Sequence, residues 1–184
     1  MAYVAVQWSY YRQHLPQVFQ IYQGGLAWPG ALAGGLLIAM VYARHLRKQP
    51  GALLWTLFPL LTSMIVFTWL ACWGEGCAYG SINHGSLGLL ALDEWGNRAF
   101  RFPTQFVGAL AALLWFIALD IQNARHLSSN LAGWIGLLGT AIILFGLTYL
   151  RADPGIFWHG LRLDAWAALG FTIFALGGGL GSLR

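Results

Sequence analysis

The chain has 184 residues, of which 58% are hydrophobic, 15% aromatic and only 9% charged. Soluble domains carry about 25% charged residues, so this composition excludes an ordinary soluble domain. The mean hydropathy of +0.62 agrees with that exclusion. The formal net charge of +4 rests on ten scattered basic residues, so we expect no nucleic-acid-binding surface. These features predict a single integral membrane domain over residues 1–184.

Long apolar runs predict an all-α polytopic membrane bundle, with about five full transmembrane helices and a partial N-terminal helix. The apolar stretch at the start of the chain is too short to span a bilayer and is typical of the last turns of a membrane helix. The full helices are expected at residues 26–43, 53–73, 103–121, 131–150 and 165–183.

Two polar connections decide the expected orientation. Basic residues divide equally between the two sides of the bundle, so their count alone does not orient the chain. The tight cluster of Arg44, Arg47 and Lys48 in a short loop places residues 44–52 in the cytoplasm. Residues 74–103 are then an extracytoplasmic loop region. This loop is long enough to be functional.

Cys72 and Cys77 are the two cysteines of the chain, and they flank a glycine-rich turn that contains Glu75. Because no second cysteine pair exists, we expect no metal site and no cofactor. The two cysteines form a disulfide if this loop faces an oxidising compartment. Otherwise they are small residues at a helix end, which is the interpretation we favour from the sequence.

Three motifs follow one another in a specific order: YQGGLAWPGALAGGLL at residues 22–37, TWLACWGEGCAYG at residues 68–80 and RFPTQFVGAL at residues 101–110. This order resembles the prolipoprotein diacylglyceryl transferase family, over roughly residues 8–181. Members of that family move a diacylglyceryl group from phosphatidylglycerol to the cysteine thiol of a lipoprotein precursor. The resemblance implies the family fold without its first helix and most of its second, in a bacterial inner membrane.

The chain departs from the family pattern at positions that usually carry polar side chains. Pro29 stands where the family usually has a histidine, and Trp69 where its pattern supplies an arginine. A later family helix usually brings an arginine and a glutamate, and the matching stretch here has Leu144 and Thr148 and keeps only Arg151. Attack by a thiol and departure of glycerol phosphate need cations where negative charge develops, which tryptophan and proline cannot supply.

The lipid-handling residues of the family pattern persist. The resemblance implies phospholipid, above all phosphatidylglycerol, as the ligand. The candidate lipid-binding residues are Tyr22, Gly24, Gly25, Tyr79, Arg101 and Gln105. Arg101 either holds a lipid phosphate or extends to the headgroups without a specific role. The catalytic candidates are Arg101, Glu75 and Arg151, although Glu75 is more simply a solvated or arginine-paired carboxylate.

These observations predict a catalytically degenerate family member that serves as a lipid-binding or structural subunit of a membrane assembly. A membrane-protein partner would cover its shortened N-terminal flank. One alternative is a working diacylglyceryl transferase that uses Arg101, Arg151 and Glu75 in an altered site. A second alternative is a small transporter or channel, against which the scarcity of charge inside the expected helices argues.

Overall fold

The computed structural model describes residue 8 and residues 12–14, 28–125 and 127–182 of the chain. The chain divides into two compact units, Met1–Arg47 and Lys48–Arg184. In the first unit, helix α3 (Trp28–His45) occupies the region of the first expected span. The partial N-terminal helix expected from the sequence lies outside the described residues.

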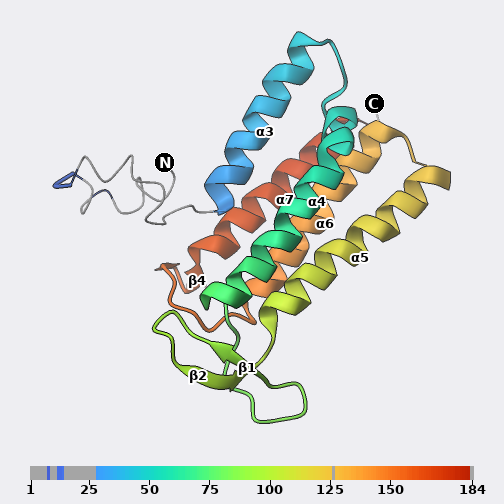
Figure 1. Cartoon of the computed structure of the whole chain (residues 1–184). Helices are drawn as coiled ribbons and strands as arrows, with labels where there is room; N and C mark the ends of the chain where they lie inside the picture. The colour runs from blue at the N-terminus through green and yellow to red at the C-terminus, as the bar shows by residue number, and fades with distance from the viewer. Residues whose placement is uncertain (1–7, 9–11, 15–27, 126, 183–184) are drawn as a thin grey trace. The chain divides into compact units, whose positions relative to one another are not determined.

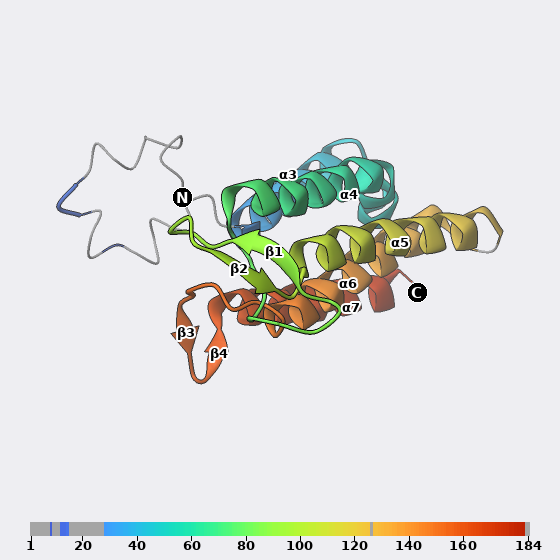
Figure 2. The same ribbon diagram turned by 60° about the horizontal axis from the view of Figure 1, so that its bottom comes forward.

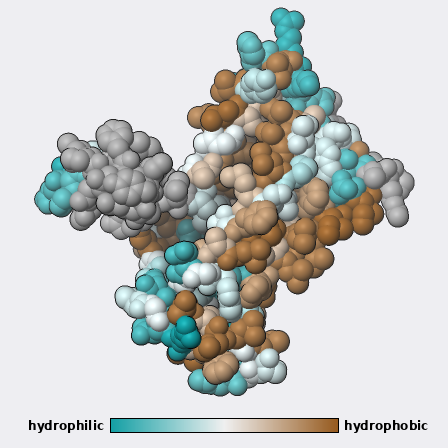
Figure 3. Space-filling view, in the orientation of Figure 1, coloured by the Kyte–Doolittle hydropathy of each residue, from teal (hydrophilic) through white to brown (hydrophobic). Residues whose placement is uncertain are grey.

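The second unit is a bundle of four helices, in which each helix runs antiparallel to the one before it in the chain (Figure 1). They are α4 (Pro50–Glu75), α5 (Thr104–Arg125), α6 (Ser129–Thr148) and α7 (Leu163–Gly181). Among the described residues, these four helices are long and apolar enough to cross a membrane, and Figure 3 shows hydrophobic residues along the exposed face of α5. Helix α3 is not among these four. It has 18 residues, and its last turn contains Arg44 and His45. The prediction of an all-α membrane bundle is confirmed.

Helix α6 is the centre of this bundle, because it packs against α4, α5 and α7. Half of its membrane-crossing window is buried, compared with 17% for α4 and for α7. Ser128 caps its first turn, with its hydroxyl accepting a hydrogen bond from the Leu131 N–H at 3.3 Å. Close packing depends on glycine: a Cβ at Gly133 would collide with the backbone of Gly51 on α4.

The two polar connections at one end of the bundle fold into antiparallel hairpins, which the sequence did not predict (Figures 1 and 2). In the loop region 74–103, strand β1 (Leu89–Leu92) pairs with β2 (Arg98–Arg101). Between α6 and α7, strand β3 (Phe157–Trp158) pairs with β4 (Leu161–Arg162). We call this end of the four-helix unit the hairpin end.

The hairpins are linked to each other through the segment after α4. Gly80 forms an antiparallel bridge with Arg151, and Ile82 forms one with Arg101. The Ala152 N–H donates to the Tyr79 carbonyl at 2.8 Å. Backbone hydrogen bonds therefore hold the connection after α4 against the connection after α6, and all the ionisable site candidates of this unit lie at or near this junction.

Candidate functional site

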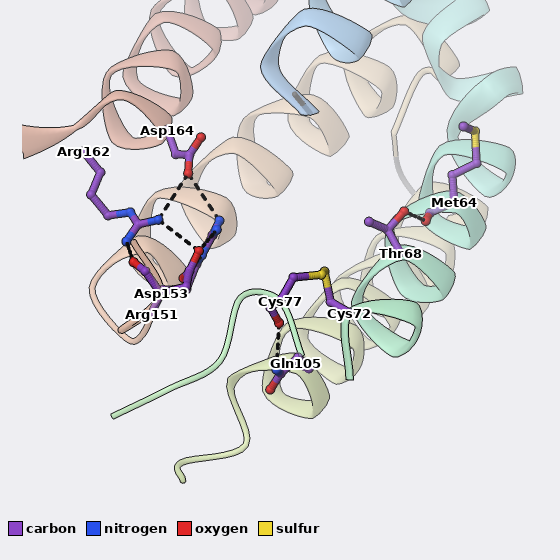
Figure 4. Close-up of a disulfide and its surroundings, with 9 residues drawn as sticks. All are labelled: Met64, Thr68, Cys72, Cys77, Gln105, Arg151, Asp153, Arg162 and Asp164. Carbon is purple, nitrogen blue, oxygen red and sulfur yellow. Dashed lines mark hydrogen bonds and ion pairs between the residues drawn. A yellow bond between two sulfur atoms is a disulfide. The ribbon is translucent and has the colours of Figure 1, made fainter. Parts of the chain in front are cut away.

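The end of α4 is closed by a disulfide between Cys72 and Cys77 (Figure 4). Of the two alternatives that the sequence left open, the structure therefore has the disulfide, and the simpler one that we favoured is wrong. Gly76 ends the helix in the left-handed conformation, at φ 69°, and a Cβ there would collide with the Asp93 carbonyl. The turn thus requires glycine and brings the helix end against the β1–β2 hairpin.

Gln105 lies in the first turn of α5 and ties this turn in place. Its Nε2 donates to the Cys77 carbonyl at 2.8 Å, and its side chain is only 1% exposed (Figure 4). The Oε1 atom is buried and has no hydrogen-bond partner among the described residues. The neighbouring Thr104 hydroxyl donates to the Leu150 carbonyl at 3.1 Å. In this structure Gln105 connects α5 to the end of α4 and is closed off from the surface.

Tyr79, Arg101 and Asp93 form a compact, largely buried group at the β1–β2 hairpin. The Arg101 guanidinium lies 4.3 Å from the centroid of the Tyr79 ring, and its NH2 is 3.3 Å from Asp93 Oδ2. Tyr79 is 4% exposed. Arg101 therefore bonds to a carboxylate and an aromatic face, while its Nε is buried without a partner among the described residues.

Two pKa shifts follow from this packing. Burial, with the nearby carboxylates, raises the pKa of the Tyr79 phenol, and the opposing charge of Arg101 does not cancel this effect. Burial by itself also raises the pKa of Asp93, but hydrogen bonds from Asn97 and Trp95 and the charge of Arg101 outweigh it, and the net pKa is lowered. Asp93 is thus an ionised partner for Arg101.

Arg151 belongs to a second group of charges, which we call the ion cluster: Arg151, Asp153, Arg162 and Asp164 (Figure 4). Arg151 NH2 lies 2.6 Å from Asp153 Oδ2, and its NH1 lies 3.2 Å from Asp164 Oδ2. Arg162 NH2 reaches the same Asp153 oxygen at 3.3 Å, and its NH1 donates to the Asp153 carbonyl at 2.7 Å. The cluster contains two cations and two anions.

The ion cluster is largely shielded from water. The side chains of Asp153 and Arg162 are 9% and 8% exposed, and that of Arg151 is 16% exposed. Burial lowers the pKa of Arg151, but the hydrogen bond and charge of Asp153 and the charge of Asp164 outweigh it, so the net pKa is above its ordinary value. Sequence reasoning singled out Arg151 without its partners, although the alternating charges of residues 151–164 were a signal for them.

The remaining site candidates do not join these groups. Glu75 is exposed at the end of α4 and forms no ion pair with any described residue. The structure brings Arg101 and Arg151 to the same junction but not Glu75 into contact with either. The candidates Tyr22, Gly24 and Gly25 lie outside the described residues.

The interior between the helices is apolar around Trp69, a position where the resemblance implies an arginine. Trp69 is 8% exposed and forms a core cluster with Ala78, Ala109 and Leu147, against which Leu144 also packs. Two of the departures from the family pattern, at positions 69 and 144, thus lie in one hydrophobic cluster. A Cβ at Gly108 of α5 would lie 2.6 Å from the Trp69 ring. The indole therefore fills the space that a side chain on α5 would otherwise occupy.

Comparison with known proteins gives a consistent result. The family model for prolipoprotein diacylglyceryl transferase matches residues 1–179. Relatives named phosphatidylglycerol–prolipoprotein diacylglyceryl transferase include one from Streptococcus equi subsp. zooepidemicus, 26% identical over 93% of this chain and 64% of its own length. One from Synechocystis is 38% identical over 66% of this chain and 33% of its own length. One from Acaryochloris marina is 42% identical over 40% of this chain and 26% of its own length. The chain thus matches less than two thirds of the length of these relatives.

Proposed function

Because the chain belongs to the prolipoprotein diacylglyceryl transferase family, whose members are multi-pass proteins of the bacterial inner membrane, we propose that it is a catalytically degenerate member. In this proposal it serves as a lipid-binding or structural subunit of a membrane assembly. The hairpin end faces the extracytoplasmic side, which the Cys72–Cys77 disulfide supports because disulfides persist in oxidising compartments.

The observation that carries the proposal is the apolar cluster around Trp69. An arginine fork binds a phosphate through two hydrogen bonds and stays charged in a low dielectric, which an indole cannot do. Here the indole is packed against Ala109 and Leu147 and directly over Gly108. Transition-state stabilisation by one such catalytic donor is worth about 3 to 4 kcal/mol, so losing this cation alone would slow turnover by roughly a hundredfold or more.

The lipid-binding part of the proposal rests on the junction between the hairpins. Phospholipid, with phosphatidylglycerol as the family substrate, would approach Arg101 and Tyr79 from the headgroup side. Among the described residues only NH2 of the Arg101 guanidinium has a hydrogen-bond partner, Asp93, so its other N–H groups are the donors for a phosphate oxygen, and the buried Nε would have to be uncovered first. Its ion pair with Asp93 reduces the net attraction, so we expect modest lipid affinity that depends on the negative charge of the headgroup.

The test is complementation in cells depleted of their own diacylglyceryl transferase, with lipoprotein modification followed by mass. We expect no rescue by the expressed and inserted chain. Trp69→Arg alone should also fail, because it places a charge in the apolar cluster without the rest of a polar site. Rescue by the unmodified chain would overturn the degenerate assignment, and its loss in Arg101→Ala but not in exposed Arg98→Ala would identify Arg101 as part of a rebuilt active site.

The subunit role has its own readout. We expect the purified chain to retain phospholipid in native mass spectra, and Arg101→Ala to retain less phosphatidylglycerol than Arg98→Ala. A structural subunit should also co-purify in fixed stoichiometry with another membrane protein. This part of the proposal would be contradicted if the purified chain retained no phospholipid and also co-purified with no other membrane protein.

The working-enzyme alternative keeps one supporting observation, the junction that brings Arg101 and Arg151 to one end of the bundle. Both cations are paired with aspartates, so a working site would require these ion pairs to open. No observation on the described residues specifically favours the transporter or channel alternative, and we do not propose it.

A further inference from the structure

The β3–β4 hairpin exposes a row of apolar side chains at the edge of a membrane span. Its turn residues His159 and Gly160 both have positive φ, at 48° and 79°, as a tight two-residue hairpin turn requires. Before the turn, Ile156, Phe157 and Trp158 are 41%, 63% and 56% exposed. Three large apolar side chains exposed next to one another on a short hairpin indicate a surface that contacts another apolar partner.

Two hydrogen bonds fix the hairpin to the first turn of α7. The Leu163 N–H donates to the Ile156 carbonyl at 2.8 Å, and Phe157 pairs with Arg162, the residue directly before α7. The Trp166 indole N–H donates to the Trp158 carbonyl at 2.9 Å, and the two indole rings lie 5.3 Å apart. Figure 2 shows the hairpin beside the start of α7.

The length of α7 determines the depth of these contacts. Its 19 residues extend about 28 Å, at 1.5 Å per residue, close to the roughly 30 Å of a hydrocarbon core. The whole helix is therefore needed to cross, and its first turn must lie at the membrane boundary. Trp158 contacts Trp166 in that first turn, so the hairpin lies at the level where aromatic side chains favour the bilayer interface.

We propose that the β3–β4 hairpin inserts Ile156, Phe157 and Trp158 into the interfacial layer of the bilayer, on the side of the hairpin end. The occupant of this apolar surface is phospholipid, because the surface continues directly into the lipid-crossing helix α7 through Trp166. Arg162 in the same hairpin places a cation at headgroup depth, 5.9 Å from the Phe157 ring. The inference does not depend on whether the chain is catalytically degenerate.

Insertion of the β3–β4 hairpin into the bilayer interface would also affect the ion cluster, because the two share Arg162. Arg162 belongs both to the hairpin and to the cluster, and Gly155, next to Ile156, packs directly against its guanidinium. A hairpin that rests in the interface therefore holds Arg162, and with it Asp153, in a fixed position relative to the bilayer surface.

The test uses the full chain in nanodiscs that contain phosphatidylcholine and phosphatidylglycerol, with a nitroxide label on Phe157→Cys. The Cys72–Cys77 disulfide stays oxidised, so only the new thiol reacts. We expect a several-fold higher ratio of oxygen accessibility to nickel-chelate accessibility than for the same label on Ser86→Cys, an exposed polar position on the other connection. The nanodisc leaves both faces open to the chelate.

Equal ratios at the two positions would overturn the proposal. So would a label at position 157 that is shielded from oxygen and chelate alike, because that result indicates a protein contact, for example a second copy of the chain. If Phe157→Cys does not purify as a single species, lipids brominated near the headgroup provide the second measurement. They should quench the tryptophan fluorescence of the unmodified chain more than that of Trp158→Phe, and equal quenching would overturn the proposal.

Discussion

The interior around Trp69 and the ion cluster at the hairpin end belong to the same four-helix unit, yet they exclude water by opposite means. Around Trp69 the cluster is apolar throughout, and an indole sits over a glycine. In the ion cluster, two arginines and two aspartates neutralise one another while largely buried. The difference indicates where these two regions tolerate charge. Charged side chains lie at the membrane boundary, where each has an oppositely charged partner, and not in the cluster between the spans.

Removing an anion from the ion cluster should give the largest loss of stability. Asp153→Ala would leave Arg151 and Arg162 to share Asp164, and breaking a buried ion pair on one side costs about 3 to 5 kcal/mol. The free energy of unfolding in mixed micelles, measured by titration with a denaturing detergent, gives the value. Asp120→Ala, which removes an exposed acid of α5, is the control and should change stability little. Equal losses for the two variants would show that the cluster is not a stabilising unit.

A smaller loss is expected in the interior. Gly108→Ala places a methyl group 2.6 Å from the Trp69 ring, and overpacking of this kind costs about 1 to 3 kcal/mol. Gly170→Ala, at an open position on α7, is the matched control and should be neutral or slightly stabilising. Trp69→Leu should suppress the cost of Gly108→Ala in a double-variant cycle. Strictly additive effects would contradict the direct contact between the two positions.

A substitution at Gln105 measures how much the hydrogen bond between α5 and the end of α4 contributes to stability. Gln105→Leu removes the donor to the Cys77 carbonyl at nearly constant volume, and a lost hydrogen bond of this kind costs about 1 kcal/mol. The same change at exposed Gln122 of α5 should have a smaller effect. The unfolding titration reports both values. A neutral Gln105→Leu would mean that the Cys77 carbonyl finds another donor.

The smallest effect is a dependence on pH at the hairpin end. The pKa of Asp93 is below its ordinary value of 3.8 in the folded protein, so its contribution to stability is present above that value and disappears as the pH falls through the lower folded-state pKa. The unfolding midpoint should therefore fall as the pH decreases below about 4. Asp93→Asn should reduce the change of the midpoint with pH below about 4, and it should not alter the pH dependence above about pH 6. An identical acid dependence in both proteins would remove Asp93 as its source.

The helices could be predicted because each apolar run needs only its own composition to indicate a span. Helix α6, expected at residues 131–150, is observed at Ser129–Thr148. The hairpins could not be predicted in this way, because the pairing of Leu89 with Arg101 depends on how the ends of α4 and α5 meet. Short strands between spans carry too little periodicity to stand out in a sequence.

The candidate site was predicted in part, for a related reason. Arg101, Tyr79 and Gln105 were named from the sequence and do lie near one another along the junction after α4. Their partners were missed, because Asp93 and the Cys77 carbonyl approach only once the loop has folded. Trp69, at a position where the resemblance implies an arginine, was visible in the sequence, but the packing of its ring over Gly108 depends on the relative rotation of two helices.

The disulfide at the end of α4 also has a consequence for how the chain is made. Its two thiols can be oxidised only after this end of the helix has been translocated out of the reducing cytoplasm. A chain threaded in the opposite direction would keep both thiols. The thiols that remain open to alkylation in unreduced cells would therefore count the molecules with inverted topology, and the protein carries its own record of correct insertion.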